Sequence, residues 1–118
     1  MAQGRWTQSM LLDFYGELLT EKQRECFDLH YNEDLSLSEI AEQLGISRQG
    51  VWDNIRRAES AMADVEEKTG LLARFEENRR LLEDLRQTME RLLPLTEGEA
   101  RALAQDAAGQ VELLISRG

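Results

Sequence analysis

The stretch that decides the fold is Leu37-Ser-Glu-Ile-Ala-Glu-Gln-Leu-Gly-Ile-Ser-Arg-Gln-Gly-Val-Trp-Asp-Asn-Ile-Arg-Arg57. It reads as two helices joined by a tight turn at Gly45, because glycine readily adopts the left-handed conformation that such a turn requires. Ala41 is small at the point where the two helices would cross closely. The core between the helices would be filled by the apolar side chains Ile40, Leu44, Ile46, Val51 and Ile55. Together these features predict a helix-turn-helix.

The segment before this stretch also reads as helix. The whole chain has one proline, Pro94, and no run of two-residue alternation typical of a strand. A first helix over about residues 8–18 is predicted from the helical spacing of its apolar residues, which are Met10, Leu11, Phe14, Leu18 and Leu19. Thr20 with Gln23 three residues later forms a capping box, which predicts a second helix that continues to about Tyr31.

The helix-turn-helix carries its own start and stop signals. Ser36 with Glu39 is another capping box, at the beginning of its first helix. Ser47 is expected to cap the second helix. Apolar residues at helical spacing extend that helix to about Lys68, and Gly70 is the expected stop.

From Leu71 onward the apolar pattern changes to alternating steps of four and three residues. This is the heptad spacing of a coiled-coil seam, formed by Leu71, Phe75, Asn78, Leu82, Leu85, Met89 and Leu92. Two interpretations remain open: an amphipathic helix folded back on its own chain, or a seam between two molecules. Asn78 is a polar residue of the kind that fixes register between partner helices.

Pro94 ends this helix, and Thr96 with Glu99 is expected to cap a last one from about residue 97. The apolar face of the last helix would consist of Leu103, Ala107, Val111 and Leu114. The expected organisation is all-α, with a helix-turn-helix domain over residues 1–70 that includes a long fourth helix. Residues 71–118 would form a C-terminal helical extension, a possible coiled-coil or dimerisation segment.

The charge of the chain limits what the motif can bind. The 118 residues include 23 acidic and 14 basic side chains, a formal net charge of -9. Because non-specific affinity for nucleic acid comes mainly from Lys and Arg at phosphates, this balance argues against a general nucleic-acid coat protein. Residues 47–60 are the exception, with three arginines against two acids. They leave room for a local basic face.

Composition also bounds location and chemistry. No apolar run approaches the ~20 residues that span a bilayer, and we expect a cytoplasmic protein without membrane insertion. Cys26 is the one cysteine and His30 the one histidine, which is too few ligands for a metal site. No glycine-rich phosphate loop or nucleophile–base pair stands out. We therefore expect no catalytic residues, no cofactor and no metal, and no enzymatic activity.

The candidate binding residues lie on the second helix of the helix-turn-helix: Ser47, Arg48, Gln49, Trp52, Asp53, Arg56 and Arg57. Arg48 and Gln49 are of the types that contact guanine and adenine edges, and Arg56 and Arg57 could hold phosphates. Trp52 could stack on an exposed base, fill a protein pocket or belong to the core. Asp53 would repel phosphates unless it pairs with Arg56 or Arg57. The motif could equally dock a protein.

Three segments resemble the YlxM family of small bacterial proteins: residues 12–24 (LDFYGELLTEKQR), 35–42 (LSLSEIAE) and 47–57 (SRQGVWDNIRR). The likeness covers about residues 8–75, and the same region looks more broadly like region 4 of sigma factors. The resemblance implies an all-helical, cytoplasmic bacterial protein, encoded beside the protein and receptor of the signal recognition particle. It implies a role in that targeting pathway and dimers formed through long C-terminal helices. The sequence departs from the family at Gly50 and Trp52.

Two functions follow as expectations. The first is an accessory or regulatory factor of the signal recognition particle, binding its RNA, its GTPase or both. The second is a sequence-specific transcription regulator that reads promoter DNA as a homodimer, with half-sites about one helical turn apart. Protein docking alone fits the charge but has no residue signal of its own.

Overall fold

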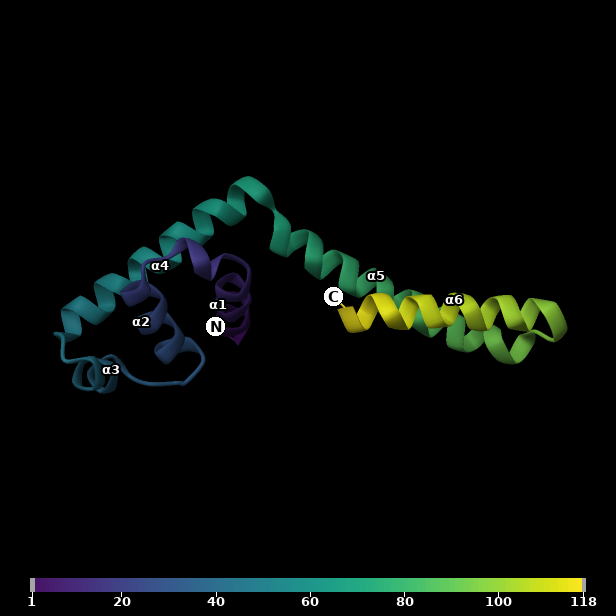
Figure 1. Cartoon of the computed structure of the whole chain (residues 1–118), viewed down its shortest axis with the longest axis horizontal. Helices are drawn as coiled ribbons and strands as arrows, with labels where there is room; N and C mark the ends of the chain where they lie inside the picture. The colour runs from purple at the N-terminus through teal and green to yellow at the C-terminus, as the bar shows by residue number, and fades with distance from the viewer. Residues whose placement is uncertain (1, 118) are drawn as a thin grey trace. The chain divides into compact units, whose positions relative to one another are not determined.

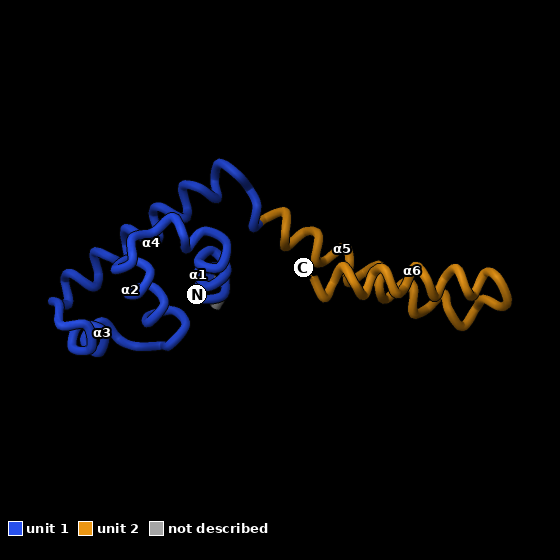
Figure 2. The backbone as a smooth tube through the Cα atoms, in the orientation of Figure 1, with its two compact units in different colours: residues 1–72 blue, residues 73–118 orange. Residues whose placement is uncertain are grey.

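The computed structural model describes residues 2–117. Its regular structure consists of six α-helices and two short 3-10 helices (Figure 1). The all-α fold with a helix-turn-helix, expected from the sequence, is confirmed. The chain divides between residues 72 and 73 into two compact units (Figure 2). These are called unit 1 and unit 2 below.

Unit 1 begins with α1 (Ala2–Tyr15), which tightens into the 3-10 turn η1 (Gly16–Leu18). The first helix therefore starts earlier than predicted, and its last turn is not α-helical. Its buried face is Leu11, Tyr15 and Leu19, whereas Leu18, expected inside, is 66% exposed. The reason is that Tyr15 anchors this face: its ring is buried and its hydroxyl donates to Glu66 Oε1 at 2.7 Å.

The helix α2 (Glu21–Tyr31) opens with the predicted capping box. The Gln23 amide N–H donates to Thr20 Oγ1, and the Thr20 N–H donates to Gln23 Oε1, both at 3.1 Å. Cys26 and Phe27 are fully buried on its inner face. Capping and burial together fix how α2 meets the rest of unit 1.

The helix-turn-helix consists of α3 (Leu37–Leu44) and α4 (Arg48–Thr69). The predicted Ser36–Glu39 capping box is present, and Gly45 takes the left-handed turn at φ 69°. Gly70 ends α4 with φ 62°, at the expected place. One side of this pair faces the core, with Ile40, Ala41, Val51, Ile55, Ala58 and Met62 buried. Because this side of α4 is buried in the core, the opposite side of the helix faces solvent.

Unit 2 is a helical hairpin. It contains α5 (Leu71–Leu92) beyond its first turn, η2 (Leu93–Leu95) and α6 (Gly98–Arg117), and its two long helices run antiparallel (Figure 1). Arg86 on α5 contacts Glu83 on the same helix and lies 3.8 Å from Glu112 Oε1 on α6. The buried apolar residues of unit 2 are Met89, Ala104 and Val111.

In the predicted seam, Leu85 and Leu92 are 45% and 40% exposed and Asn78 is exposed, as a seam between two molecules would leave them in one chain. Two other details of the tail differ from the sequence prediction. On α6 the inner face includes Ala104, while Leu103 and Leu114 are 62% and 54% exposed. The Thr96 hydroxyl donates to the Leu93 carbonyl at 2.9 Å. Thr96 therefore caps the C-terminal end of η2. The sequence had predicted that it caps the N-terminus of α6.

Candidate nucleic-acid interface

The outward side of α4 begins at its first residue. Ser47 Oγ accepts from the Gly50 N–H at 2.9 Å, which ends the preceding turn and starts the helix at Arg48. Val51 and Ile55 then point into the core. Helical geometry consequently places the residues between them on the outside.

Six of the seven candidate residues are exposed and Asp53 is half-buried. They form two rows of four-residue steps along α4, because residues four apart are neighbours on a helix surface. One row is Arg48, Trp52 and Arg56, and the other is Gln49, Asp53 and Arg57. We call the surface formed by Ser47 and these two rows the recognition face.

Trp52 lies in the middle of the recognition face and not in the core. Its side chain is 46% exposed. The guanidinium carbon of Arg56 lies 5.4 Å from the centre of the indole ring, within the distance of a cation–π contact. The contact places a cation and a large aromatic surface side by side, facing solvent.

Asp53 pairs with Gln49 and not with Arg56 or Arg57, a choice that the sequence left open. Its Oδ1 accepts from Gln49 Nε2 at 3.1 Å, and none of the ion pairs among the described residues joins it to Arg56 or Arg57. Gln49 stands one turn earlier in the same row, which brings the two side chains together. The carboxylate charge therefore remains in the middle of the recognition face.

A hollow of about 540 Å³ adjoins this face, lined by Leu37, Arg48, Gln49 and Trp52. We call it the α3–α4 groove. Leu37, which the sequence analysis did not select, is the first residue of α3 and contributes an apolar wall. Two features of the sequence could have identified Leu37 as a binding residue. It directly follows the capping Ser36, and it is an apolar residue outside the predicted core.

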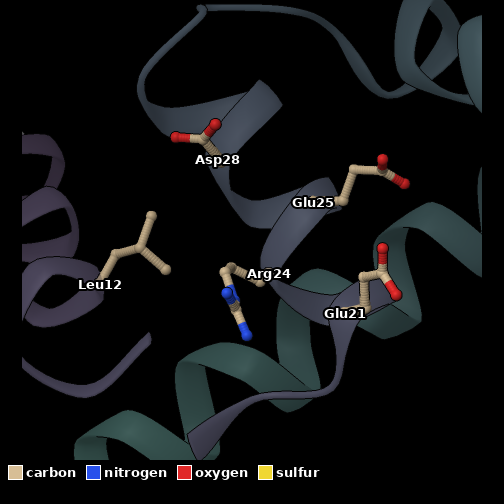
Figure 3. A pocket seen from close by; sticks show the side chains of 5 residues that line it. All are labelled: Leu12, Glu21, Arg24, Glu25 and Asp28. Carbon is tan, nitrogen blue, oxygen red and sulfur yellow. The ribbon is translucent and has the colours of Figure 1, made fainter. Parts of the chain in front are cut away.

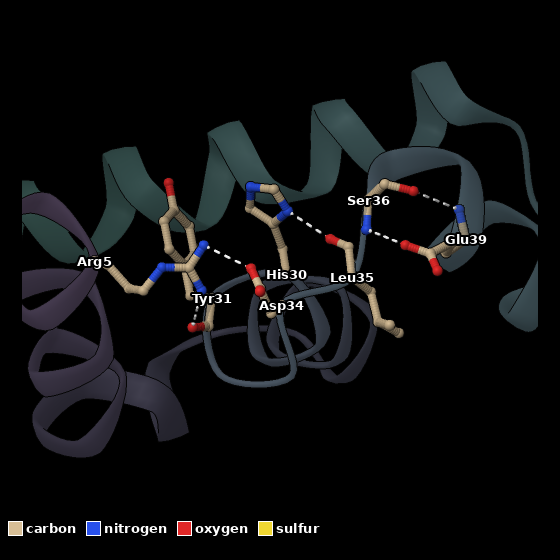
Figure 4. A network of polar contacts seen from close by, with 7 residues as sticks. All are labelled: Arg5, His30, Tyr31, Asp34, Leu35, Ser36 and Glu39. Carbon is tan, nitrogen blue, oxygen red and sulfur yellow. Dashed lines mark hydrogen bonds and ion pairs between the residues drawn. The ribbon is translucent and has the colours of Figure 1, made fainter. Parts of the chain in front are cut away.

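Polar contacts fix the segment that leads from α2 into α3 (Figure 4). Arg5 donates to the Tyr31 carbonyl at 3.0 Å and to Asp34 Oδ1 at 2.9 Å. His30 Nδ1 lies 2.9 Å from the Leu35 carbonyl oxygen. These contacts hold the start of α3, and with it the Leu37 wall, relative to α1 and α2.

Tyr31 connects α2 directly to α4. Its hydroxyl donates to the Glu59 carboxylate, one turn beyond Arg56. Burial and the Glu59 carboxylate raise the pKa of Tyr31 to about 12. The neutral hydroxyl therefore persists at physiological pH and ties the recognition helix to its support. Tyr31 and Glu59 lie far apart in the chain and share no sequence pattern, so this pair was not predicted.

A second hollow lies between α1 and α2, with a volume of about 350 Å³ (Figure 3). Glu21, Glu25 and Asp28 line it with Arg24 and the apolar Leu12. Three carboxylates against one arginine would repel phosphate. This hollow is therefore the less suitable of the two for nucleic acid.

Other chemistry has little support in the described residues. Among residues 2–117 no group of three or more His, Cys, Asp and Glu side chains is placed to hold a metal ion. Burial raises the pKa of the Cys26 thiol, which makes it a poor nucleophile. Within the same residues no helix combines the length and apolar character needed to cross a membrane.

Comparison with known proteins identifies the family. Residues 2–97 match the family described as "Putative helix-turn-helix protein, YlxM / p13 like" (UPF0122). A UPF0122 protein of Halalkalibacterium halodurans is 48% identical over 81 residues, which are 69% of this chain and 74% of that protein. One of Thermoanaerobacter sp. is 50% identical over 82 residues, 70% of each chain. One of Bacillus cereus is 52% identical over 77 residues, 65% of this chain and 70% of that protein. The chain belongs to this YlxM / p13-like helix-turn-helix family.

Proposed function

We propose that this YlxM / p13-like protein binds RNA through the recognition face and acts as an accessory or regulatory factor of the signal recognition particle pathway. The observation that supports RNA binding is the exposed Trp52 ring with the Arg56 guanidinium over it. Unpaired RNA bases stack on aromatic rings and on guanidinium planes. A surface that offers both suits an RNA with unpaired bases.

The charge of the chain favours a selected RNA over duplex DNA. At a net charge of -9, the phosphate term that supplies most non-specific affinity is weak. Asp53, unpaired with any arginine, adds local repulsion against a phosphate backbone that lies along α4. Arg56 and Arg57 would hold phosphates at the edges of the contact, while Trp52 would supply stacking. The particle's RNA is the candidate ligand, and its GTPase the candidate protein partner.

We further propose that the protein works in the cytoplasm as a homodimer formed through unit 2. The support is the set of leucines that the hairpin leaves exposed: Leu81, Leu85, Leu92, Leu95, Leu103, Leu113 and Leu114. A single hairpin cannot cover this much apolar surface, and a second copy could. In this arrangement unit 1 would bind the ligand and unit 2 would form the homodimer.

The test is affinity capture from bacterial cytosol with tagged protein, followed by identification of bound proteins and sequencing of bound RNA and DNA. An Arg56→Ala, Arg57→Ala variant is run in parallel, with Arg24→Ala as the matched loss of an exposed arginine outside the recognition face. We expect the particle's RNA or GTPase with wild type and Arg24→Ala, and its loss with the double variant. Equal recovery with all three would exclude the recognition face as the contact.

The second candidate is a sequence-specific transcription regulator. The observation in its favour is that Arg48 and Gln49 stand exposed in the first turn of α4, where helix-turn-helix proteins read base edges. Selection from a random duplex pool should then yield a defined site. Six phosphate contacts would give a log–log salt slope of about -5, from ~0.9 per phosphate. A flat salt response with no enriched site would exclude this function.

A further inference from the structure

We propose that the α3–α4 groove is a receptor for a single unpaired purine base, which lies between Trp52 and Leu37 with its edge at Arg48 and Gln49. The inference rests on the proposed RNA binding and specifies which part of the RNA is read. It assigns ligand contacts to Leu37 and Gln49 and an electrostatic role to Asp53, beyond the arginine contacts of the proposed function. Three features of the groove carry it: its walls, its polar groups and its charge.

The walls suit a flat aromatic ligand. Trp52 supplies an indole surface on α4 and Leu37 an apolar surface at the start of α3. The volume of about 540 Å³ falls within the ~300–1,000 Å³ of small-molecule sites. A paired base has its faces covered by its neighbours in the stack. An unpaired base offers both faces, and a purine offers the larger one.

The polar groups present one acceptor beside several donors. A carboxylate only accepts hydrogen bonds, so the contact with Asp53 orients the Gln49 amide with an N–H toward Asp53. The Gln49 carbonyl oxygen remains to accept from a base amino or imino group. The Arg48 guanidinium, which makes no hydrogen bond with another described residue, supplies donors for O6 or N7. Both purines carry a donor beside an acceptor on one edge.

The charge selects a base over a phosphate. Asp53 is half-buried next to Gln49 and places a negative charge beside the groove. This carboxylate repels a phosphate next to Gln49 and attracts the amino group of a base, while the Arg48 guanidinium in the groove pairs with the acceptors on the edge of the base. The groove therefore takes the base of a nucleotide whose phosphates remain near Arg56 and Arg57, outside it.

The test uses the fluorescence of Trp52 in a Trp6→Phe background, where it is the single tryptophan. The probes are short RNA stem–loops that differ only in one loop nucleotide, A, G, C or U, and a fully paired duplex of the same composition. We expect quenching of Trp52 by the A or G loop at a Kd at least about fivefold below that for the C and U loops, because the larger purine ring stacks over more of the indole surface. The duplex should not quench.

Three variants identify the contacts. Leu37→Ser should weaken binding of the purine loop, while Leu18→Ser, at an exposed leucine of unit 1 outside the groove, should leave it unchanged. Asp53→Asn removes the charge and frees the amide of Gln49. It should raise affinity for all loops and reduce the preference for purines. Trp52→Phe should retain most of the affinity for the purine loop. Because this variant lacks the reporting tryptophan, its binding is measured with a fluorescent label on the RNA.

Failure of this inference is distinguishable from failure of the proposed function. Equal affinity for purine and pyrimidine loops, or no effect of Leu37→Ser, overturns the base receptor while RNA binding stands. Quenching by the duplex as strong as by the loops also overturns it. Absence of binding to every RNA, in an assay where Arg56→Ala, Arg57→Ala makes no difference, overturns both.

Discussion

Unit 1 and unit 2 are both helical but differ in how completely they fill their interiors. Among the residues that the structure describes, twelve apolar ones are buried in unit 1 and three in unit 2, although unit 2 has more than half as many residues. Unit 1 uses its core to fix α4 and leaves polar and aromatic side chains outside. Unit 2 leaves leucines outside. We propose on this basis that unit 1 presents the binding surface and that a second copy covers the exposed leucines of unit 2.

The comparison predicts its largest effect at a matched pair of methionines. Met62 of unit 1 is 1% exposed and Met89 of unit 2 is 8% exposed. Met62→Ala should lower the free energy of unfolding by about 2–5 kcal/mol, because it leaves a cavity in a filled core. Met89→Ala should cost less, since fewer side chains surround it. Urea unfolding with hydrogen exchange resolves the two units, and an equal loss in both would contradict the comparison.

A smaller effect is expected where α2 joins α4. Tyr31→Phe removes the hydroxyl that donates to Glu59 and should cost about 1–2 kcal/mol. It should also change the alkaline limit of stability. In the unfolded chain Tyr31 ionises near 10.0, in the folded protein near 12, so unfolding releases a proton between these pH values. Wild-type stability should therefore fall from pH 10 to 12 more steeply than that of Tyr31→Phe. Parallel pH profiles would exclude this role for the pair.

Two glycines should respond in opposite directions. Gly45 has φ 69°, so Gly45→Ala should cost about 1–2 kcal/mol in unit 1. Gly109 lies inside α6 with open space where a Cβ would be, so Gly109→Ala should stabilise unit 2 by about 0.5–1 kcal/mol. Thermal melts of the two variants measure this. Destabilisation by Gly109→Ala would mean that α6 packs differently from the hairpin described here.

The smallest effect on folding should come from the exposed leucines. Leu103→Ser should change the free energy of unfolding of the isolated chain by less than about 0.5 kcal/mol, because the side chain is 62% exposed. It should nevertheless weaken self-association in sedimentation equilibrium, with Gln105→Ser on the same helix as control. A monomeric wild type would show that something other than a second copy covers unit 2.

The sequence was most predictive where the signals are local. Ser36, Ser47 and Gly45 act through hydrogen bonds and φ angles within a few residues, so α3 and α4 were predicted closely. The inner face of α6 was predicted less well. A helical period shows which residues share a face but not which face packs against the neighbouring helix, and here Ala104 is buried while Leu103 is exposed.

The candidate site was predicted only in part. Exposure of Arg48, Trp52 and Arg56 follows from helical spacing once the core positions are assigned. Leu37 joins them through the angle between α3 and α4, which no spacing within one helix encodes. Which neighbour Asp53 contacts, Gln49 or an arginine, depends on the side-chain rotamers. The charges in the sequence do not determine these rotamers.

The most direct test of the central claim is a backbone amide NMR titration of the full chain with the RNA of the signal recognition particle. We expect the largest shift changes at residues 47–57 and near Leu37, with the helices of unit 2 little affected. Shift changes confined to unit 2, or none at saturating RNA, would contradict the claim that the recognition face binds this RNA.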